Sequence, residues 1–263
     1  MIRVLHVSDL HFHKNQSNNE QLKLTDKIFK AGFGSNDYLL LTGDITDDGD
    51  KGQFREATNA VQAFSPRILA VPGNHDYGPV GNFYSESCAR YFDNVFCKNL
   101  NIPAGFLAKK APAVTLLSDN QGTEVVAIGL NSNSKTSDIT DFARGEVGET
   151  QLKALDKILT DARYEGKPKL VYLHHRPQPC SVFLALNDYE DLMSVVHNRV
   201  DVLCFGHSGG DLQKDESTAA RVMAVREKPY GVRYLLNANS SVAARKYFEI
   251  TFDQGKLKGV TIK

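Results

Sequence analysis

Five short apolar runs in this chain each end abruptly in polar residues, and this pattern restricts the fold more than any other feature. The runs are IRVLHV before SDLH, DYLLL before TGD, RILAV before PGNHD, KLVYL before HHR and VDVLCF before GHS. Runs this short and this rich in Val, Ile and Leu indicate buried strands. Helical patterns lie between them, at residues 20–31, 51–64, 82–93, 149–163 and 187–198. Strands that alternate with helices are typical of parallel βα units.

The remaining segments add strands of a different kind. The stretches AVTLLS and TEVVAIGL are joined near residue 122 through DNQG, which predicts a hairpin. After residue 219 the pattern predicts strands only, at about 220–225, 231–237, 246–252 and 256–262. We find no Pro- or Ser-rich linker, repeat or low-complexity tract in the sequence. We therefore expect an α/β fold in a single domain, residues 1–263, that forms a four-layer αββα sandwich of two facing mixed β-sheets with outer helices.

The composition is that of an ordinary globular protein. Hydrophobic residues make up 41% and charged residues 24% of the 263 residues, which is enough apolar material for a sizeable core. Lys plus Arg and Asp plus Glu both number 31, so the net charge is zero, which argues against binding nucleic acid through a broad basic field.

The four cysteines have no CxxC spacing and indicate reduced thiols. Without a signal peptide or an apolar stretch of about 18 residues, we expect no membrane partner and a cytoplasmic location.

Side chains that can bind metal follow all five apolar runs. In parallel α/β sheets, ligand sites gather at the carboxyl ends of the strands. Here those ends carry Asp9 with His11, Asp44, the triplet Asn74, His75 and Asp76, the pair His174 and His175, and finally His207. Each fragment alone is a weak signal, because acids often cap turns and histidines often pack in cores. Five strand ends that all bear oxygen or imidazole ligands together predict a metal centre.

The ordered series DLH, GD, GNHD, HH and GH resembles the calcineurin-like metallophosphoesterase superfamily over residues 9–207. Within it, SDLHF, FARGEVGETQLKALDKIL and LHHRPQP are similar to the bacterial class III cyclic-nucleotide phosphodiesterases. The resemblance implies two divalent metal ions about 3.5–4 Å apart, which supply a bridging hydroxide that attacks a phosphoester. A ligand set that mixes hard oxygens with imidazoles suits manganese, iron or zinc.

The resemblance also assigns a role to each residue. It places Asp9 and His11 on a first metal, Asp44 between both metals, and Asn74, His174 and His207 on the second. His75 would be the unligated catalytic histidine, with Asp76 as the acid behind it. Of the two neighbouring histidines we expect His174, directly after the strand, to be the ligand rather than His175. Arg176 is either a third catalytic group, which would bind the phosphate through its forked guanidinium, or a surface charge.

One position departs from the superfamily pattern. The last motif usually reads GHxH, and its second histidine completes the first metal site, but here that position is Gly209. The first site then keeps three ligands, a count that catalytic zinc sites commonly have, and we expect it to bind metal more weakly. Asp211 or His13 could take the missing place, although His13 also fits an ordinary loop residue. Gly209 is either natural or an introduced replacement.

These features predict a metal-dependent phosphoesterase that hydrolyses a small phosphodiester, with a cyclic nucleotide as one candidate. A phosphomonoesterase or protein phosphatase of the same fold is the first alternative. A nuclease is disfavoured by the zero net charge. A non-catalytic scaffold with a degraded first metal site is a further alternative, but a scaffold would have no use for His75 and a complete second ligand set. The sequence does not predict an oligomeric state.

Overall fold

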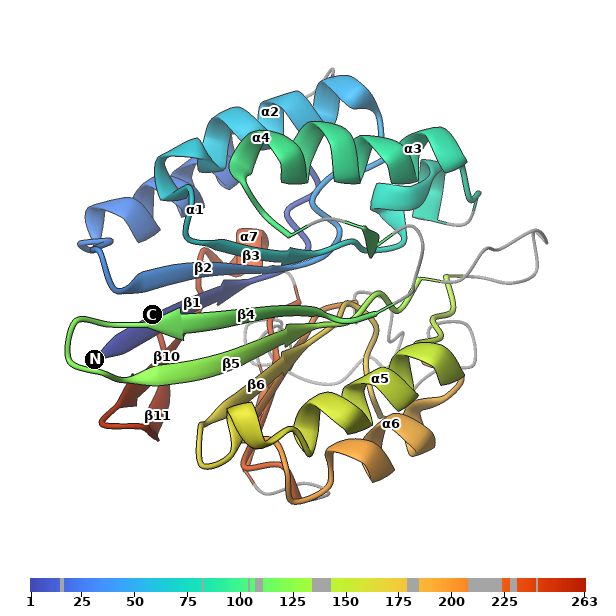
Figure 1. Ribbon diagram of the computed structural model, residues 1–263. Helices are drawn as coiled ribbons and strands as arrows, with labels where there is room; N and C mark the ends of the chain where they lie inside the picture. The colour runs from blue at the N-terminus through green and yellow to red at the C-terminus, as the bar shows by residue number, and fades with distance from the viewer. Residues whose placement is uncertain are drawn as a thin grey trace, which may run out of the picture.

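Two β-sheets pack face to face in this protein, and helices cover the outer side of each (Figure 1). The computed structural model describes residues 1–14, 17–81, 83–103, 105–106, 111–133, 143–178, 185–207, 224–227, 231–239 and 241–263. The expected four-layer αββα sandwich of two mixed sheets is thereby confirmed.

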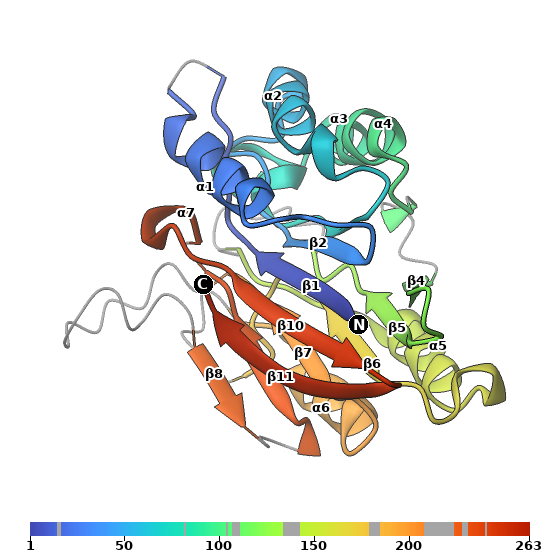
Figure 2. The same cartoon turned by 90° about the vertical axis from the view of Figure 1, so that its left-hand side faces the viewer.

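The first sheet has the strand order β11-β10-β1-β2-β3. Its strands are β1 (Ile2–Val7), β2 (Asp37–Thr42), β3 (Ile68–Val71), β10 (Phe248–Asp253) and β11 (Lys256–Ile262). β1, β2 and β3 are parallel, whereas β10 is antiparallel to both β1 and β11 (Figure 2). The helices on its side are α1 (Asn19–Lys30), α2 (Lys51–Val61), α3 (Glu86–Tyr91), α4 (Lys98–Leu100) and α7 (Ser241–Ala244). A π-helical segment, Phe92–Cys97, joins α3 to α4.

The second sheet has the strand order β4-β5-β6-β7-β9-β8. Its strands are β4 (Ala113–Ser118), β5 (Glu124–Gly129), β6 (Lys169–Tyr172), β7 (Val202–Phe205), β8 (Ala224–Glu227) and β9 (Tyr234–Asn237). The four central strands are parallel, and β4 and β8 are antiparallel at the edges. Helices α5 (Glu149–Leu159) and α6 (Tyr189–Val196) cover its outer side (Figure 1).

Apolar burial explains why the strands stand where the sequence predicts them. One core fills the space between the sheets and beneath α1 and α2, and includes Val4, Leu40 and Phe54. A second core fills the space beneath α5 and α6, and includes Leu155 and Leu192. The central strands are covered on both faces, so their sequences are apolar throughout rather than alternating. This packing fixes the carboxyl ends of β1, β2, β3, β6 and β7 as a rigid platform.

The expected elements differ from the observed ones mainly at their ends. The hairpin around residue 122 is confirmed, since β4 and β5 pair antiparallel. The expectation of strands only after residue 219 is wrong, because Ser241–Ala244 forms the short helix α7. The helix expected from residue 82 starts at Glu86, where the Ser85 side chain accepts a hydrogen bond from Cys88 N (3.4 Å) and caps it. Among the described helices, none is long and apolar enough to cross a membrane.

Candidate metal centre

The carboxyl ends of five parallel strands, three from the first sheet and two from the second, meet at one edge of the sandwich. The parallel strands run toward the right-hand side of Figure 1. The loops that follow them bring together the six expected metal ligands: Asp9, His11, Asp44, Asn74, His174 and His207. Side chains from both sheets thus converge on one region rather than several.

The backbone is strained where these side chains leave the strands. Asp9, His11, Asp44 and His207 all adopt left-handed conformations, with φ of 56°, 46°, 48° and 51°. Non-glycine residues rarely adopt this conformation, which costs of the order of 1 kcal/mol or more each, and it persists only where the surroundings enforce it. Four such residues in one small region are typical of a functional site.

Two glycines allow the loops to approach one another closely. A Cβ at Gly73 would lie 2.2 Å from Asp44 Oδ1, and one at Gly206 would lie 2.5 Å from Asp9 Oδ2. Any larger residue would push the carboxylates away from the site. The glycines of the GNHD and GH motifs are therefore required by the packing of the loops.

The atoms around the His174 imidazole form the first of two ligand groups. His174 Nδ1 donates to the carbonyl oxygen of Thr42 (2.8 Å), so Nε2 faces the site. From Nε2 the distances are 3.0 Å to Asn74 Oδ1, 3.1 Å to His207 Nδ1 and 3.3 Å to Asp44 Oδ2. Ligand atoms about 2.1 Å from a tetrahedral metal lie ~3.4 Å apart, so these four residues could hold one ion.

The second ligand group shares Asp44 with the first. His11 Nε2 lies 3.7 Å from Asp44 Oδ2, and the carboxylate, His11 and His75 have nitrogen and oxygen atoms within 4.8 Å of one another. Asp9 Oδ2 is buried and has no hydrogen-bond partner, and burial raises the pKa of this carboxyl group. A buried carboxylate oxygen without a partner is costly unless a cation is bound beside it. The donor set thus fits a pair of metal ions with Asp44 between them.

The buried charge of Asp44 and the nearby imidazoles shift one another's pKa values. Burial alone would raise the pKa of Asp44, but the charge of His174 and the other nearby imidazoles outweighs it and holds this pKa well below the usual value. Burial would lower the pKa of His174, yet the negative charge of Asp44 raises it to about 9. Burial, assisted by His174, lowers the pKa of His207 to about 3. The protons thus compensate a buried negative charge, a task that a divalent cation would take over.

His75 and Asp76, expected to act together, have different surroundings. His75 Nδ1 donates to the carbonyl oxygen of Asp47 (2.7 Å), so the position behind His75 is held by a backbone carbonyl and not by Asp76. The Asp76 carboxylate instead accepts from the backbone N–H groups of Ile45, Thr46 and Gly73, at 2.8–3.2 Å, and from the Thr46 hydroxyl. Asp76 therefore ties the loop after β2 to the loop after β3.

The other predicted residues are placed as follows. His175 is buried with its Nδ1 2.8 Å from the hydroxyl of Ser132, and this agrees with the choice of His174 as the ligand. Arg176 is half-buried directly after the pair, and its role stays a prediction. Gly209 and Asp211 lie outside the described residues.

Sequence reasoning missed Asp47, which contacts the site through its side chain. Its two carboxylate oxygens lie 3.4 Å from His11 Nδ1 and 3.2 Å from His13 Nδ1. The segment TDDGD that holds Asp47 contains three acids, and nothing in the sequence distinguishes the one that faces the histidines. His13 is held through Asp47 rather than placed among the ligands, so its use as a substitute ligand stays a prediction.

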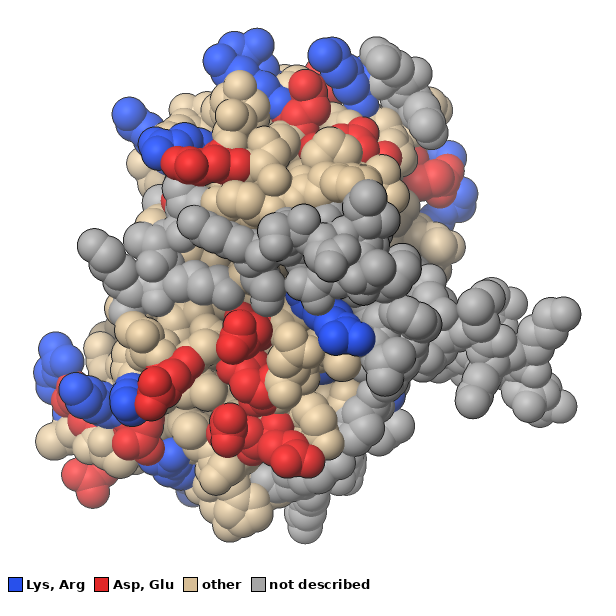
Figure 3. Space-filling model, turned by 90° about the vertical axis from the view of Figure 1, so that its right-hand side faces the viewer, with Lys and Arg blue, Asp and Glu red and all other residues tan. Residues whose placement is uncertain are grey.

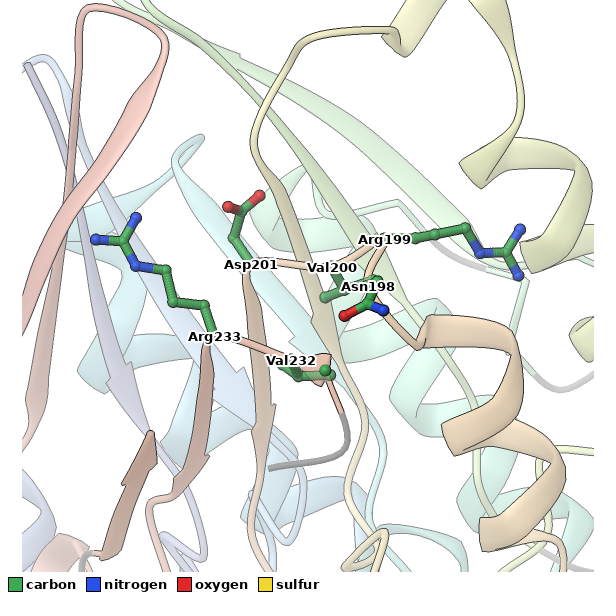
Figure 4. A pocket seen from close by; sticks show the side chains of 7 residues that line it. Asn198, Arg199, Val200, Asp201, Val232 and Arg233 are labelled. Carbon is green, nitrogen blue, oxygen red and sulfur yellow. The ribbon is translucent and has the colours of Figure 1, made fainter. Parts of the chain in front are cut away.

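A surface hollow elsewhere in the protein does not compete with this site. It has a volume of about 390 Å³ and is lined by residues 198–201 and 231–233, at the amino ends of β7 and β9 and so at the opposite end of the strands (Figure 4). Its two arginines point apart (Figure 4), since Arg199 binds Asp156 and Arg233 donates to the carbonyl oxygen of Leu257. Without convergent polar groups, it offers no chemistry.

Comparisons with known proteins agree with this geometry. The family model of the calcineurin-like phosphoesterases matches residues 2–210. A probable cyclic nucleotide phosphodiesterase of Coxiella burnetii is 22% identical, over 80% of this chain and 77% of that protein. A 3',5'-cyclic-nucleotide phosphodiesterase of Nostoc sp. is 26% identical, over 78% and 71%. A purple acid phosphatase from yellow lupin seeds shares the fold with a TM-score of 0.62 at 13% identity, and this chain (99% covered) spans about half (53%) of its length.

The hydrogen bonds of Asp76 lead to a prediction about stability. We expect Asp76→Ala to lower the free energy of unfolding by about 3 kcal/mol or more, because three buried N–H groups would lose their acceptor and each unsatisfied group costs about 1–3 kcal/mol. Urea denaturation measures the loss. The control is Asp26→Ala, which removes an exposed ion pair with Lys30 and should change stability by less than about 0.5 kcal/mol. A loss below about 1 kcal/mol for Asp76→Ala would show that Asp76 does not hold the loops after β2 and β3 together.

Proposed function

We propose that this chain, which belongs to the calcineurin-like phosphoesterase family, hydrolyses a small phosphodiester and that a cyclic nucleotide is the favoured substrate. Family membership makes the chain a metal-dependent phosphoric ester hydrolase. The observation that carries the choice of reaction is the pair of ligand groups that share Asp44. The choice of a diester is supported by the relatives from Coxiella burnetii and Nostoc, which are named as cyclic nucleotide phosphodiesterases.

The proposed ligand sets follow from the contacts described above. Asp9, His11 and Asp44 would hold one ion, since the Asp9 carboxyl interacts electrostatically with both other residues, and Asp44, Asn74, His174 and His207 would hold the other. The family generally binds two divalent metals, and the mixture of carboxylate, amide and imidazole donors favours manganese, iron or zinc. When bound, such a pair activates water and neutralises the charge of the phosphodiester. The Asn74 side chain is oriented for this task, since its Nδ2 donates to the Gly81 carbonyl (3.1 Å) and its Oδ1 faces His174.

His75 would handle the proton of the leaving group. Its Nδ1 is engaged by the Asp47 carbonyl, so Nε2 is the ring atom that can hold a proton for the departing alkoxide. Its backbone N–H donates to Asp44 Oδ1 (3.0 Å), which keeps the ring next to the shared carboxylate. A proton delivered from a fixed position contributes about 10²–10⁴-fold to a rate. Arg176 would bind a phosphate oxygen beside it.

The charge on the layer of α5 and α6 disfavours a nucleic acid strand along that part of the surface. Figure 3 views the protein from the side toward which the parallel strands run, and acidic side chains gather on its lower part, the layer of α5 and α6. A groove of about 650 Å³ there is lined by five acids and two lysines: Glu146, Glu149, Asp156, Asp188, Asp191, Lys153 and Lys157. A polyanionic strand on this described part of the surface would be repelled.

The proposal is tested with a panel of substrates at saturating manganese. We expect a generic aryl phosphodiester and cyclic AMP to be hydrolysed faster than an aryl phosphomonoester. The reverse order would identify a phosphomonoesterase of the same fold. Absence of hydrolysis of all three, in protein whose bound metal has been measured, would identify the non-catalytic scaffold.

The role of His75 predicts a specific kinetic defect. We expect His75→Ala to lower kcat on a diester by at least about tenfold, the low end of losses from acid–base catalysis, and to leave the number of bound metal ions unchanged. The control is His197→Gln, at the end of α6 and away from the site, which should retain both kcat and metal. Loss of metal from His75→Ala would show instead that His75 is a ligand.

The missing histidine of the last motif leads to a prediction that rests on the sequence. If Gly209 leaves the first metal one ligand short, Gly209→His should bind this metal more tightly and shift half-maximal activation to manganese concentrations at least about tenfold lower. That shift is about 1.4 kcal/mol. Activity is titrated with manganese for both proteins at one pH, because protons compete for the ligands. An unchanged midpoint would mean that another side chain, such as Asp211 or His13, already fills the position.

A further inference from the structure

Asp47 contacts three histidines of the site at once. Its carboxylate oxygens lie 3.4 Å from His11 Nδ1 and 3.2 Å from His13 Nδ1, and its backbone carbonyl accepts from His75 Nδ1 at 2.7 Å. Asp47 is about one-third exposed and His13 about one-quarter. One residue therefore faces both a proposed metal ligand and the proposed proton donor, the first through its side chain and the second through its backbone.

The backbone holds Asp47 in place through a short ladder between two loops. Phe12 and Thr46 form a parallel bridge between the loop after β1 and the loop after β2. In this ladder, Phe12 N donates to the Ile45 carbonyl (2.9 Å) and Asp47 N donates to the Phe12 carbonyl (3.2 Å). Main-chain hydrogen bonds thus fix the backbone of Asp47 next to the loop that carries His11, and the short Asp47 side chain has little distance to span.

The two ring nitrogens of His11 have different neighbours. Nε2 lies 3.7 Å from Asp44 Oδ2, and Nδ1 lies 3.4 Å from Asp47 Oδ1, an ion-pair contact that lacks the geometry of a hydrogen bond. A histidine that binds metal through one nitrogen almost always offers the other N–H to a carboxylate, a carbonyl or water, which fixes the orientation of the ring and strengthens it as a ligand. The carboxylate of Asp47 lies on that side of the His11 ring, within ion-pair distance of Nδ1.

We propose that Asp47 is a positioning residue for the first metal: its carboxylate orients His11 as a ligand, and His13 steadies the carboxylate from the other side. The inference rests on the proposed function for the identity of the first metal group. It has added weight in this chain because Gly209 stands where the superfamily has a second histidine, so His11 is the single imidazole among the three ligands that the sequence assigns to that metal.

The test is a count of bound manganese in the full-length protein and in Asp47→Asn. This variant removes the charge, keeps the shape and leaves the backbone carbonyl that holds His75. The proteins are equilibrated against manganese buffers of graded free concentration, and bound manganese is measured. We expect the dissociation constant of the weaker, first metal to rise by about 10–100-fold and that of the second to stay the same. At saturating manganese, kcat should return to the level of the unchanged protein.

A neighbouring acid provides the matched control. The Asp48 carboxylate accepts from Gln53 Nε2 (3.1 Å), and Asp48→Asn should leave both dissociation constants and the melting temperature unchanged. Equal binding of the first metal by Asp47→Asn and the unchanged protein would overturn the proposal. So would equal weakening of both metals, or a melting temperature well below that of Asp48→Asn, since either result shows a merely structural role.

A second variant separates Asp47 from His13. His13→Gln should weaken the first metal less than Asp47→Asn does, because the contact between Asp47 and His11 remains. A larger effect of His13→Gln would make His13 itself a ligand and would overturn the proposal. The binding measurements count metal and not product, so they can be interpreted even if the unchanged protein hydrolyses no phosphodiester. Failure of the proposed function is thereby distinguished from failure of this inference.

Discussion

The buried carboxylate of Asp44 is the interaction on which the arrangement of the site depends. It lies at the end of β2 and contacts an imidazole from each sheet, His11 from the first (3.7 Å) and His174 from the second (3.3 Å). An isolated charge in such a place would be very costly, so cationic partners, whether protonated imidazoles or metal ions, are built into the fold around it. The candidate metal centre therefore lies where loops from the two sheets meet.

The packing beneath the site keeps its residues in their strained backbone conformations. The left-handed backbone at Asp9, His11, Asp44 and His207 would relax in a flexible loop, because each such residue is unfavourable on its own. Here each one follows, within a few residues, a strand that is buried against the apolar cores. Ligands carried on the ends of rigid strands are held more accurately than ligands carried on long loops. Such accuracy matters for a metal centre, in which several ligand atoms must converge.

Much of the fold and most of the candidate site could be predicted from local sequence. The five strands that precede the ligands are apolar because they are covered on both faces, and that burial is visible in the sequence itself. The short helix Ser241–Ala244 was missed, since four residues cover only about one helical turn and cannot show a repeating apolar pattern. The expected pairing of His75 with Asp76 is absent from the structure. Neighbours in sequence can point in opposite directions, and here His75 points toward the site whereas Asp76 points toward the loop backbones.

The order of apolar runs and polar residues is enough to predict which chemical groups follow the strands, and parallel βα units bring those strand ends to one edge of a sheet. The packing of distant segments against one another sets which of these groups meet. It selected Asp47 from three acids in one segment, through a backbone ladder to Phe12, and directed the Asp76 carboxylate to the backbones of two loops. Periodicity records which face of an element is buried, but the direction in which a loop side chain points is set by contacts between segments far apart in the chain.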